Sequence, residues 1–271
     1  MSGPIVAMGG AEFSMRPENE ALHDYVLSHV ETGSAVRICL LPTASGDPND
    51  QIISFHAAME RRGCIASAIS LFRLGVTPID FAEHLLSQDV IYVTGGSMVN
   101  LLALWREHRI DAIVREAHER GIVLCGYSAG SMCWFEQGVS RGGGAPAAVD
   151  GLGLVAGSHC VHYSQDPERR DTYRRLIADG TLLGGLALDD HAAALIRDGE
   201  VVEAVRSVES SSAFRVSASE GDGGEISEER IETRLLPAPQ PTGTEIGLEE
   251  MRERRLMQGR RPPGGRLGRR G

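Results

Sequence analysis

A short apolar run that breaks at a G-x-S-x-G pentad constrains this chain more than any other feature. The run covers residues 121–125, the pentad covers 126–130 with its serine at Ser128, and a helical pattern follows. A serine on a sharp turn from a strand into a helix holds its hydroxyl out of the sheet, and small neighbours leave room for strained backbone and substrate. The turn also directs backbone N–H groups and the positive end of a helix dipole at a developing oxyanion. The pentad predicts a nucleophilic serine, although it also arises by chance in a chain with 33 glycines.

Strand-like and helix-like segments alternate before residue 217. We expect strands at 4–8, 36–41, 64–71, 89–94, 121–127 and 184–188, and helices at 17–31, 49–62, 79–87, 97–119 and 129–138. Apolar strands separated by helices indicate a mostly parallel sheet covered on both faces. Segments at 193–197, 200–208 and 212–216 predict a β-meander, with Asp198-Gly199 as a hairpin turn. The pattern predicts one α/β domain over 1–216.

Unusual residues follow several of these strands. They are Gly9-Gly10, Pro42-Thr43-Ala44-Ser45, Thr94-Gly95-Gly96-Ser97 and Ser128. Parallel sheets bind ligands at the carboxyl ends of their strands. These loops therefore predict a single site at one sheet edge.

Composition removes several function classes. The chain has no lysine, so all 27 basic residues are arginine. A Ser-Lys dyad, a pyridoxal Schiff base and a P-loop all need a lysine amine. The net charge of −10 argues against a nucleic-acid-binding body, and the odd count of five cysteines suits reduced thiols. No apolar segment approaches the length of a membrane span. We expect a cytoplasmic protein without a membrane partner.

Residues 217–271 differ in character from the rest. Residues 217–250 hold nine acidic residues and two arginines, whereas 251–271 hold one acidic residue and eight arginines. Such a segment cannot build a core, so we expect a disordered tail, with a short helix at 245–257. Its arginines indicate either a solvated extension without a role or a basic arm that docks on an acidic surface or nucleic acid.

A serine nucleophile needs a base, and two histidines compete for this role. His162 follows an apolar segment and precedes a polar loop, as expected of a base at a strand end. His159 lies three residues earlier and is its rival. Six of the other seven histidines fall on predicted helices, where structural or solvated roles are usual.

Three spaced motifs resemble a known family. They are Val93-Thr94-Gly95-Gly96-Ser97, then Gly126-Tyr127-Ser128-Ala129-Gly130 with its following helix, then Gly151-Leu152-Gly153-Leu154 with His162-Tyr163. Over residues 4–216 the chain is similar to the peptidase E (aspartyl dipeptidase) and cyanophycinase family of serine peptidases. The resemblance implies a three-layer sandwich like that of class I glutamine amidotransferases.

The resemblance also implies roles for individual residues. Ser128 would be the nucleophile and His162 the general base, and backbone N–H groups of Gly96 and Ala129 would form the oxyanion hole. Gly96 lies on a neighbouring strand-end loop, where bare backbone can approach a carbonyl closely. We expect Gly10 and Ser97 to contact the substrate.

The third triad member is less clear. Relatives place an acidic residue after the nucleophile helix, where this chain has Arg141 and a run of glycines. Glu136, expected near the end of that helix, is our first choice, and Asp150 and Asp166 are its rivals. Without an acid at His162 the rate would fall by about 10⁴.

The substrate is expected to be a small peptide that contains aspartate. Arg169, Arg170 and Arg174 follow the His162 loop and could bind a carboxylate, or could be a solvated helix face. The triplet 189–191 (Asp-Asp-His) resembles a family motif that would buttress the site or an interface. We expect no cofactor and no metal. The sequence does not decide between a monomer and a homodimer.

Two other functions remain. One is a catalytically weakened relative that binds a small acidic ligand or a partner, suggested by Arg141 and its neighbouring glycines. The other is an esterase of the α/β-hydrolase type, which shares the pentad. That fold has a longer interval before its histidine and an HGGG-like loop. Here His162 follows Ser128 by 34 residues (162 − 128), and no HGGG occurs.

Overall fold

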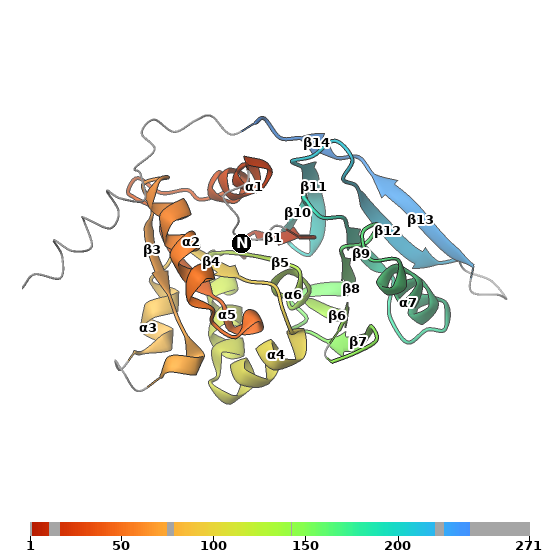
Figure 1. Ribbon diagram of the computed structural model, residues 1–271, viewed down its shortest axis with the longest axis horizontal. Coiled ribbons are helices and arrows are strands. Elements are labelled where there is room, and N and C mark those ends of the chain that lie inside the picture. The colour runs from red at the N-terminus through yellow and green to blue at the C-terminus, as the bar shows by residue number, and fades with distance from the viewer. Residues whose placement is uncertain (1, 11–16, 75–78, 142, 220–224, 239–271) are drawn as a thin grey trace, which may run out of the picture. The chain divides into compact units, whose positions relative to one another are not determined.

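Two sheets organise the part of the chain that the computed structural model describes, namely residues 2–10, 17–74, 79–141, 143–219 and 225–238 (Figure 1). The first sheet has the strand order β14-β11-β10-β1-β5-β4-β2-β3. Its strands are β1 (Ile5–Met8), β2 (Arg37–Leu41), β3 (Ile65–Ala68), β4 (Val90–Val93), β5 (Val123–Tyr127), β10 (Ala192–Arg197), β11 (Glu200–Arg206) and β14 (Arg234–Leu235).

The second sheet has the order β13-β12-β9-β8-β6-β7. Its strands are β6 (Phe135–Ser140), β7 (Ala147–Asp150), β8 (Val155–Val161), β9 (Gly185–Leu188), β12 (Ala213–Ala218) and β13 (Ile226–Ile231). Strands β6, β8 and β9 are parallel, so the loops that leave their carboxyl ends lie at one edge. The segment 184–188 therefore belongs to this sheet and not to the first.

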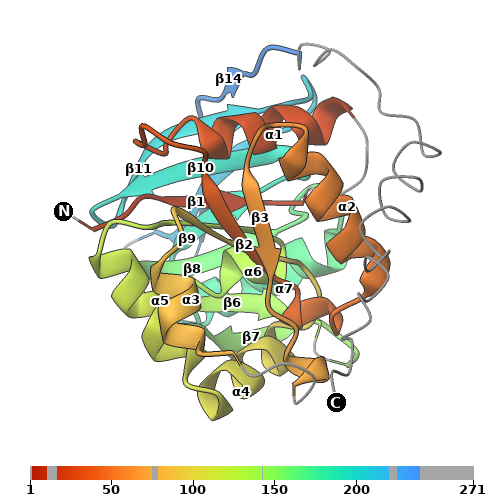
Figure 2. The ribbon, with the colours of Figure 1, turned by 90° about the vertical axis from the view of Figure 1, so that its left-hand side faces the viewer.

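Helices pack on both faces of the first sheet, and one helix packs on the second. The helices on the first sheet are α1 (Pro17–Leu27), α2 (Asn49–Glu60), α3 (Phe81–Leu86), α4 (Met98–Glu107), α5 (Ile110–Glu119) and α6 (Ala129–Met132), and short 3₁₀ turns lie at Thr43–Ser45 and Leu71–Arg73. The helix on the second sheet is α7 (Pro167–Ala178). One apolar cluster joins α1 and α2 to one face, and a second joins α3 to α6 and the second sheet to the other. A third cluster joins α7 to the second sheet. Figure 2 shows α1 and α2 lying next to one another. The result is the expected α/β sandwich.

The central strands of the first sheet are parallel. Strand β1 pairs with β5, β5 with β4, β4 with β2, and β2 with β3, all in the parallel sense. Their carboxyl ends therefore meet at one edge, as the alternation of segments predicts. Strands β10 and β11 form an antiparallel hairpin. Asp198 and Gly199 both have positive φ, 50° and 82°, which fits a two-residue hairpin turn.

Two helix predictions need correction. The helix expected at 129–138 ends at Met132, and β6 begins at Phe135, because residues 135–140 lie between β7 and β8 and extend the second sheet. The helix expected at 97–119 divides into α4 and α5 at Arg109, whose φ of 57° is left-handed and ends the first helix.

The folded domain extends past the predicted boundary at residue 216. Strand β13 pairs with β12 over six positions, and β14 pairs with β11. An isoleucine stands at each end of 226–231, and the four residues between them are polar or charged, which suits an edge strand with solvent at its side. The helix expected at 245–257 and the arginine-rich segment after it lie outside the described residues.

Among the residues described, no helix has both the length and the apolar character that a bilayer crossing requires.

Candidate active site

Ser128 occupies the sharp turn between β5 and α6. Its backbone has φ 53° and ψ −118°, a conformation that a non-glycine residue rarely adopts. The Ser128 N–H donates to the Met8 carbonyl oxygen at 3.1 Å, which fixes the turn against the end of β1. A Cβ atom at Gly126 would lie 2.3 Å from the Gly130 oxygen, and one at Gly130 would lie 2.3 Å from the Val93 oxygen. The two glycines of the pentad therefore allow the close packing that holds the serine in place.

His162 faces Ser128. The His162 Nε2 atom lies 2.9 Å from the Ser128 Oγ atom, and the His162 Nδ1 atom is hydrogen-bonded to Asp190 Oδ1. His162 follows β8, and Asp190 follows β9, so two neighbouring parallel strands of the second sheet supply both side chains. Their side chains are 29% and 32% exposed. The arrangement is a serine, an imidazole and a carboxylate in one line, open to a substrate.

Asp190 sets the proton positions in this line. Burial raises the pKa of the Asp190 carboxyl, but the hydrogen bond from His162, together with the charges of His162, His191 and Arg169, outweighs burial and holds this pKa below its ordinary value. An ionised carboxylate only accepts hydrogen bonds. The imidazole therefore carries its proton on Nδ1, which leaves Nε2 free to accept the proton of the Ser128 hydroxyl.

The three acids proposed from the sequence lie elsewhere. Glu136 belongs to β6, and its carboxylate accepts a hydrogen bond from the Gly157 N–H at 2.8 Å. Asp150 ends β7 on the strand next to Glu136. Asp166 caps α7 by accepting from the Arg169 N–H and pairs with Arg141. Asp190 therefore takes the position beside His162 Nδ1 that the sequence analysis predicts for Glu136. Glu136 lies elsewhere because its segment is a strand and not a helix.

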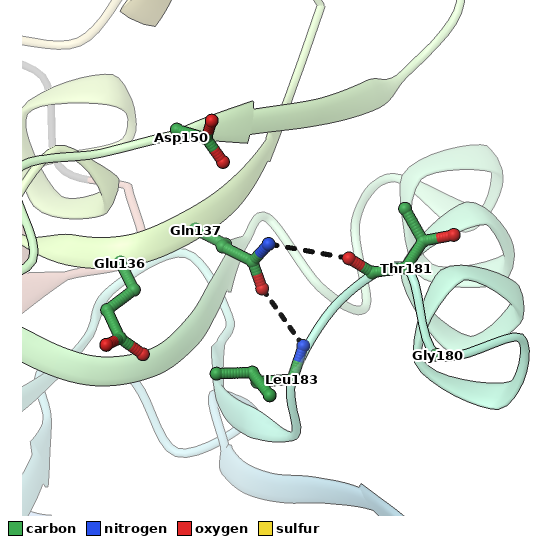
Figure 3. Close-up of a pocket in the computed structure, with 6 residues that line it drawn as sticks. All are labelled: Glu136, Gln137, Asp150, Gly180, Thr181 and Leu183. Carbon is green, nitrogen blue, oxygen red and sulfur yellow. Dashed lines mark hydrogen bonds between the residues drawn. The ribbon is translucent and has the colours of Figure 1, made fainter.

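Glu136 and Asp150 line a separate open hollow of about 380 Å³ (Figure 3). The side chain of Gln137 connects its two walls by donating to the Thr181 oxygen and accepting from the Leu183 N–H. The hollow contains neither Ser128 nor His162. Its lining residues are Glu136, Gln137, Asp150, Gly180, Thr181 and Leu183.

His159, the rival base, is fully buried. Its Nδ1 atom lies 2.9 Å from the Leu186 oxygen and its Nε2 atom 2.8 Å from Ser131 Oγ. Because a carbonyl oxygen only accepts hydrogen bonds, Nδ1 of His159 carries the proton and Nε2 accepts from the Ser131 hydroxyl. Burial lowers the pKa of His159 to about 4, so the ring is neutral. His159 is thus a hydrogen-bonded core residue away from the nucleophile.

Gly96 and Ala129, the two residues expected to form an oxyanion hole, lie on the loop beside Ser128 and at the start of α6. Gly96 has φ 138°, and a Cβ atom there would lie 2.1 Å from the Ala44 oxygen. A Cβ atom on the adjacent Gly95 would lie 3.0 Å from the Ser128 Cβ, which places this loop against the nucleophile. Ala129 opens α6. Within the described residues, neither the Gly96 nor the Ala129 N–H donates to another backbone group, so both are available to an oxyanion.

We predict that Gly96→Ala lowers kcat by about 10²–10³-fold, the loss expected for one oxyanion donor. The new methyl group must push the loop away from the Ala44 oxygen, and the Gly96 N–H moves with it. Steady-state kinetics on a dipeptide substrate, with kcat and KM determined separately, measure the effect. Gly63→Ala is the control: Gly63 has φ 73° and open space around it, so it adds left-handed strain alone. Equal rates in both variants would contradict the role of Gly96.

Gly10 and Ser97, expected at the substrate, have other contacts. A Cβ atom at Gly10 would lie 2.1 Å from Asp190 Oδ1 and 2.9 Å from His162 Cε1, so Gly10 makes room for the imidazole–carboxylate pair. The Ser97 hydroxyl caps α4 by accepting from the Asn100 N–H at 3.2 Å. Both residues lie at the active-site edge, and both support the framework of the site.

The arginines after His162 are paired with acids. Arg169 is buried and lies 3.4 Å from an Asp166 oxygen, and burial lowers the pKa of its guanidinium. Arg170 and Arg174 both pair with Glu228 of β13. Glu228 also accepts from the Tyr163 hydroxyl at 2.6 Å. Glu228 lies in the segment predicted to be disordered, and no sequence signal connected it with this cluster.

Asp190 was missed as the acid although the sequence carried a signal for it. The triplet 189–191 follows directly on the apolar run at 184–188, which is a strand-end position like those of the other site residues. Proximity in sequence favoured Glu136, whereas the fold brings Asp190 to His162 across 28 residues.

The sequence of this chain is similar to those of known peptidases. The model of peptidase family S51 matches residues 5–204, which is well over half of the chain. A curated protein of Bacillus subtilis (strain 168), the uncharacterized peptidase YgaJ, is 40% identical over 222 residues, covering 82% of this chain and 95% of YgaJ.

Two solved structures share the fold. A Listeria monocytogenes EGD-e protein classed with peptidase E aligns over 76% of this chain and 99% of its own, with a TM-score of 0.55 and 19% identity. A peptidase from an acI-B1 actinobacterium aligns over 88% of this chain and 98% of its own, with a TM-score of 0.61 and 16% identity.

Proposed function

Because this chain belongs to peptidase family S51 and is a serine-type peptidase, we propose that it is an exopeptidase acting on small peptides that contain aspartate. The proposed catalytic group is Ser128, His162 and Asp190. The observation that carries it is the continuous hydrogen-bonded line from the Ser128 hydroxyl through the His162 ring to the Asp190 carboxylate.

The geometry supports a two-step acyl transfer. His162 Nε2 takes the proton of the Ser128 hydroxyl as the oxygen attacks the scissile carbonyl carbon. The resulting oxyanion accepts hydrogen bonds from the Gly96 and Ala129 N–H groups. Asp190 stabilises the imidazolium, which then protonates the leaving amine. A water molecule, deprotonated by His162, hydrolyses the acyl-enzyme and restores the serine.

The preference for an acidic residue is supported by the resemblance to peptidase E and by the arginines of α7. A substrate carboxylate would compete with Asp166 and Glu228 for Arg169 and Arg170, the two guanidinium groups nearest to His162 in sequence. Hydrolysis of dipeptides with N-terminal aspartate, compared with the isosteric asparagine dipeptides, tests this preference. Equal kcat/KM for the two series would contradict it.

A fluorophosphonate probe tests the catalytic assignment. We expect the probe to add covalently to the wild-type protein, with the adduct located on Ser128 by peptide mass spectrometry. Ser128→Ala should carry no adduct. An unlabelled wild-type protein, or an adduct on another residue, would overturn the proposal.

The weakened relative considered above loses its support. It rested on Arg141 standing where relatives carry an acid, but Arg141 pairs with Asp166 and Glu168, and Asp190 meets the imidazole instead. The family match likewise favours a peptidase over an esterase.

A further inference from the structure

We infer that Asp189, together with Gln165, is a positioning residue that holds His162 and Asp190 in register with Ser128. The inference rests on the proposed function and adds to it two side chains that do not touch the reacting atoms.

Asp189 connects the loops that bear the two partners. Its side chain is buried, with the residue 1% exposed. One carboxylate oxygen accepts from the Ser164 N–H at 2.9 Å, and the other accepts from the Ser212 N–H at 2.9 Å. Ser164 stands two residues after His162, and Asp189 immediately precedes Asp190. The carboxylate therefore ties the histidine loop to the aspartate turn and ties both to the start of β12.

The backbone of Asp189 is fixed as well. Its N–H donates to the Ser212 oxygen at 3.0 Å, and its own oxygen accepts from the Ala192 N–H at 3.2 Å. Gly9 approaches so closely that a Cβ atom there would lie 2.1 Å from the Asp189 oxygen. The turn thus has little freedom to move while these contacts hold.

Gln165 makes a second connection between the same two loops. Its side-chain oxygen accepts from the Asp190 N–H at 3.0 Å, and its own N–H donates to the His162 oxygen at 3.1 Å. The Asp189 side chain thus connects the aspartate turn to the histidine loop, and the Gln165 side chain connects the histidine loop to the aspartate turn. Together they fix the distance between the two backbones.

Such support is needed because the loops are strained. His162 has φ 53° and His191 has φ 63°. Residues other than glycine adopt such left-handed values only at a cost in conformational energy. Strained segments persist only where their surroundings hold them. A shift of about 1 Å in a catalytic group can lower the rate by about 10²-fold.

Asp189→Asn is the informative change because it preserves the size of the side chain. An amide has one acceptor oxygen, and its NH₂ group would face a backbone N–H, so one of the two loops is released. We expect the fluorophosphonate labelling rate of Ser128 to fall by about 10- to 100-fold. Asp47→Asn is the matched control. Asp47 is also a buried aspartate, 2% exposed, and it accepts from the Ser70 hydroxyl and the Phe72 N–H. Its labelling rate should stay near that of the wild type.

A double variant separates positioning from a merely structural role. If Asp189 acts through the His162–Asp190 pair, Asp189→Asn combined with Asp190→Asn should label no more slowly than Asp190→Asn alone. A second readout is the downfield proton resonance of a histidine N–H that donates to a carboxylate. It should weaken or disappear in Asp189→Asn and persist in Asp47→Asn.

The outcomes are distinct. Multiplying losses in the double variant, or an unchanged rate and resonance in Asp189→Asn, would overturn the inference. If Asp189→Asn cannot be purified, Gln165→Ala, at an exposed position, takes its place in the same comparison, and an unchanged rate there would overturn it. A wild-type protein without probe reactivity would overturn the proposed function, and the resonance would still decide whether Asp189 holds the pair.

Discussion

His162→Ala is expected to lower kcat by about 10⁶-fold, the loss seen when the base of a Ser-His-acid group is removed. The reason is geometric: the His162 ring is the group 2.9 Å from the Ser128 hydroxyl that can take its proton. Alanine leaves the serine without a base and the leaving amine without an acid. Single-turnover hydrolysis of a dipeptide substrate measures the loss.

His159→Ala is the matched control for this variant. It removes the same side chain three residues away, but from the core, where Ser131 and the Leu186 oxygen lose their partner. Leaving a buried polar group unpaired costs about 1–3 kcal/mol in the free energy of unfolding. We expect a lower Tm and a largely preserved kcat. A near-complete loss of kcat in His159→Ala, with activity retained in His162→Ala, would move the base to His159.

Asp190→Asn is expected to lower kcat by about 10⁴-fold with a small change in KM. The asparagine amide can present an N–H group to Nδ1, which favours the tautomer with the proton on Nε2. That tautomer cannot accept the proton of the Ser128 hydroxyl. Steady-state kinetics on one dipeptide substrate, with kcat and KM determined separately, test the expectation.

Glu136→Gln tests the alternative acid with the same chemical change. The Glu136 carboxylate contacts the Gly157 N–H, and an amide oxygen can replace that acceptor. We expect kcat within about twofold of the wild type, as for most changes away from the reacting groups. A 10⁴-fold loss in Glu136→Gln with no loss in Asp190→Asn would restore the first assignment.

Local signals in the sequence were enough to predict the fold class and the sharp turn at Ser128. The pentad around Ser128 specifies its turn because a side chain at Gly126 or Gly130 would collide with the backbone of the adjacent elements. The alternation of apolar strands and helices indicated the α/β sandwich, and the resemblance to peptidase E is confirmed by the family match.

The third partner of the site depended on contacts distant in sequence. Nothing local to Asp190 states that β8 and β9 are parallel neighbours, which is what brings it to His162. The helix expected at 129–138 gave Glu136 a plausible path to the imidazole, but tertiary pairing with β7 and β8 made that segment a strand. Strand β13 was missed for a similar reason: its charged residues suggest solvent, whereas Glu228 meets Tyr163 and the arginines of α7.

The proposed nucleophile and the two residues proposed to activate it come from different sheets. Ser128 leaves β5 of the first, while His162 and Asp190 leave β8 and β9 of the second. Catalytic activity therefore depends on the packing between the two sheets as well as on the integrity of each sheet. At low denaturant concentration, a small displacement of one sheet relative to the other would separate Ser128 from His162 while both sheets kept their secondary structure. Activity should therefore be lost at a lower denaturant concentration than the circular dichroism signal.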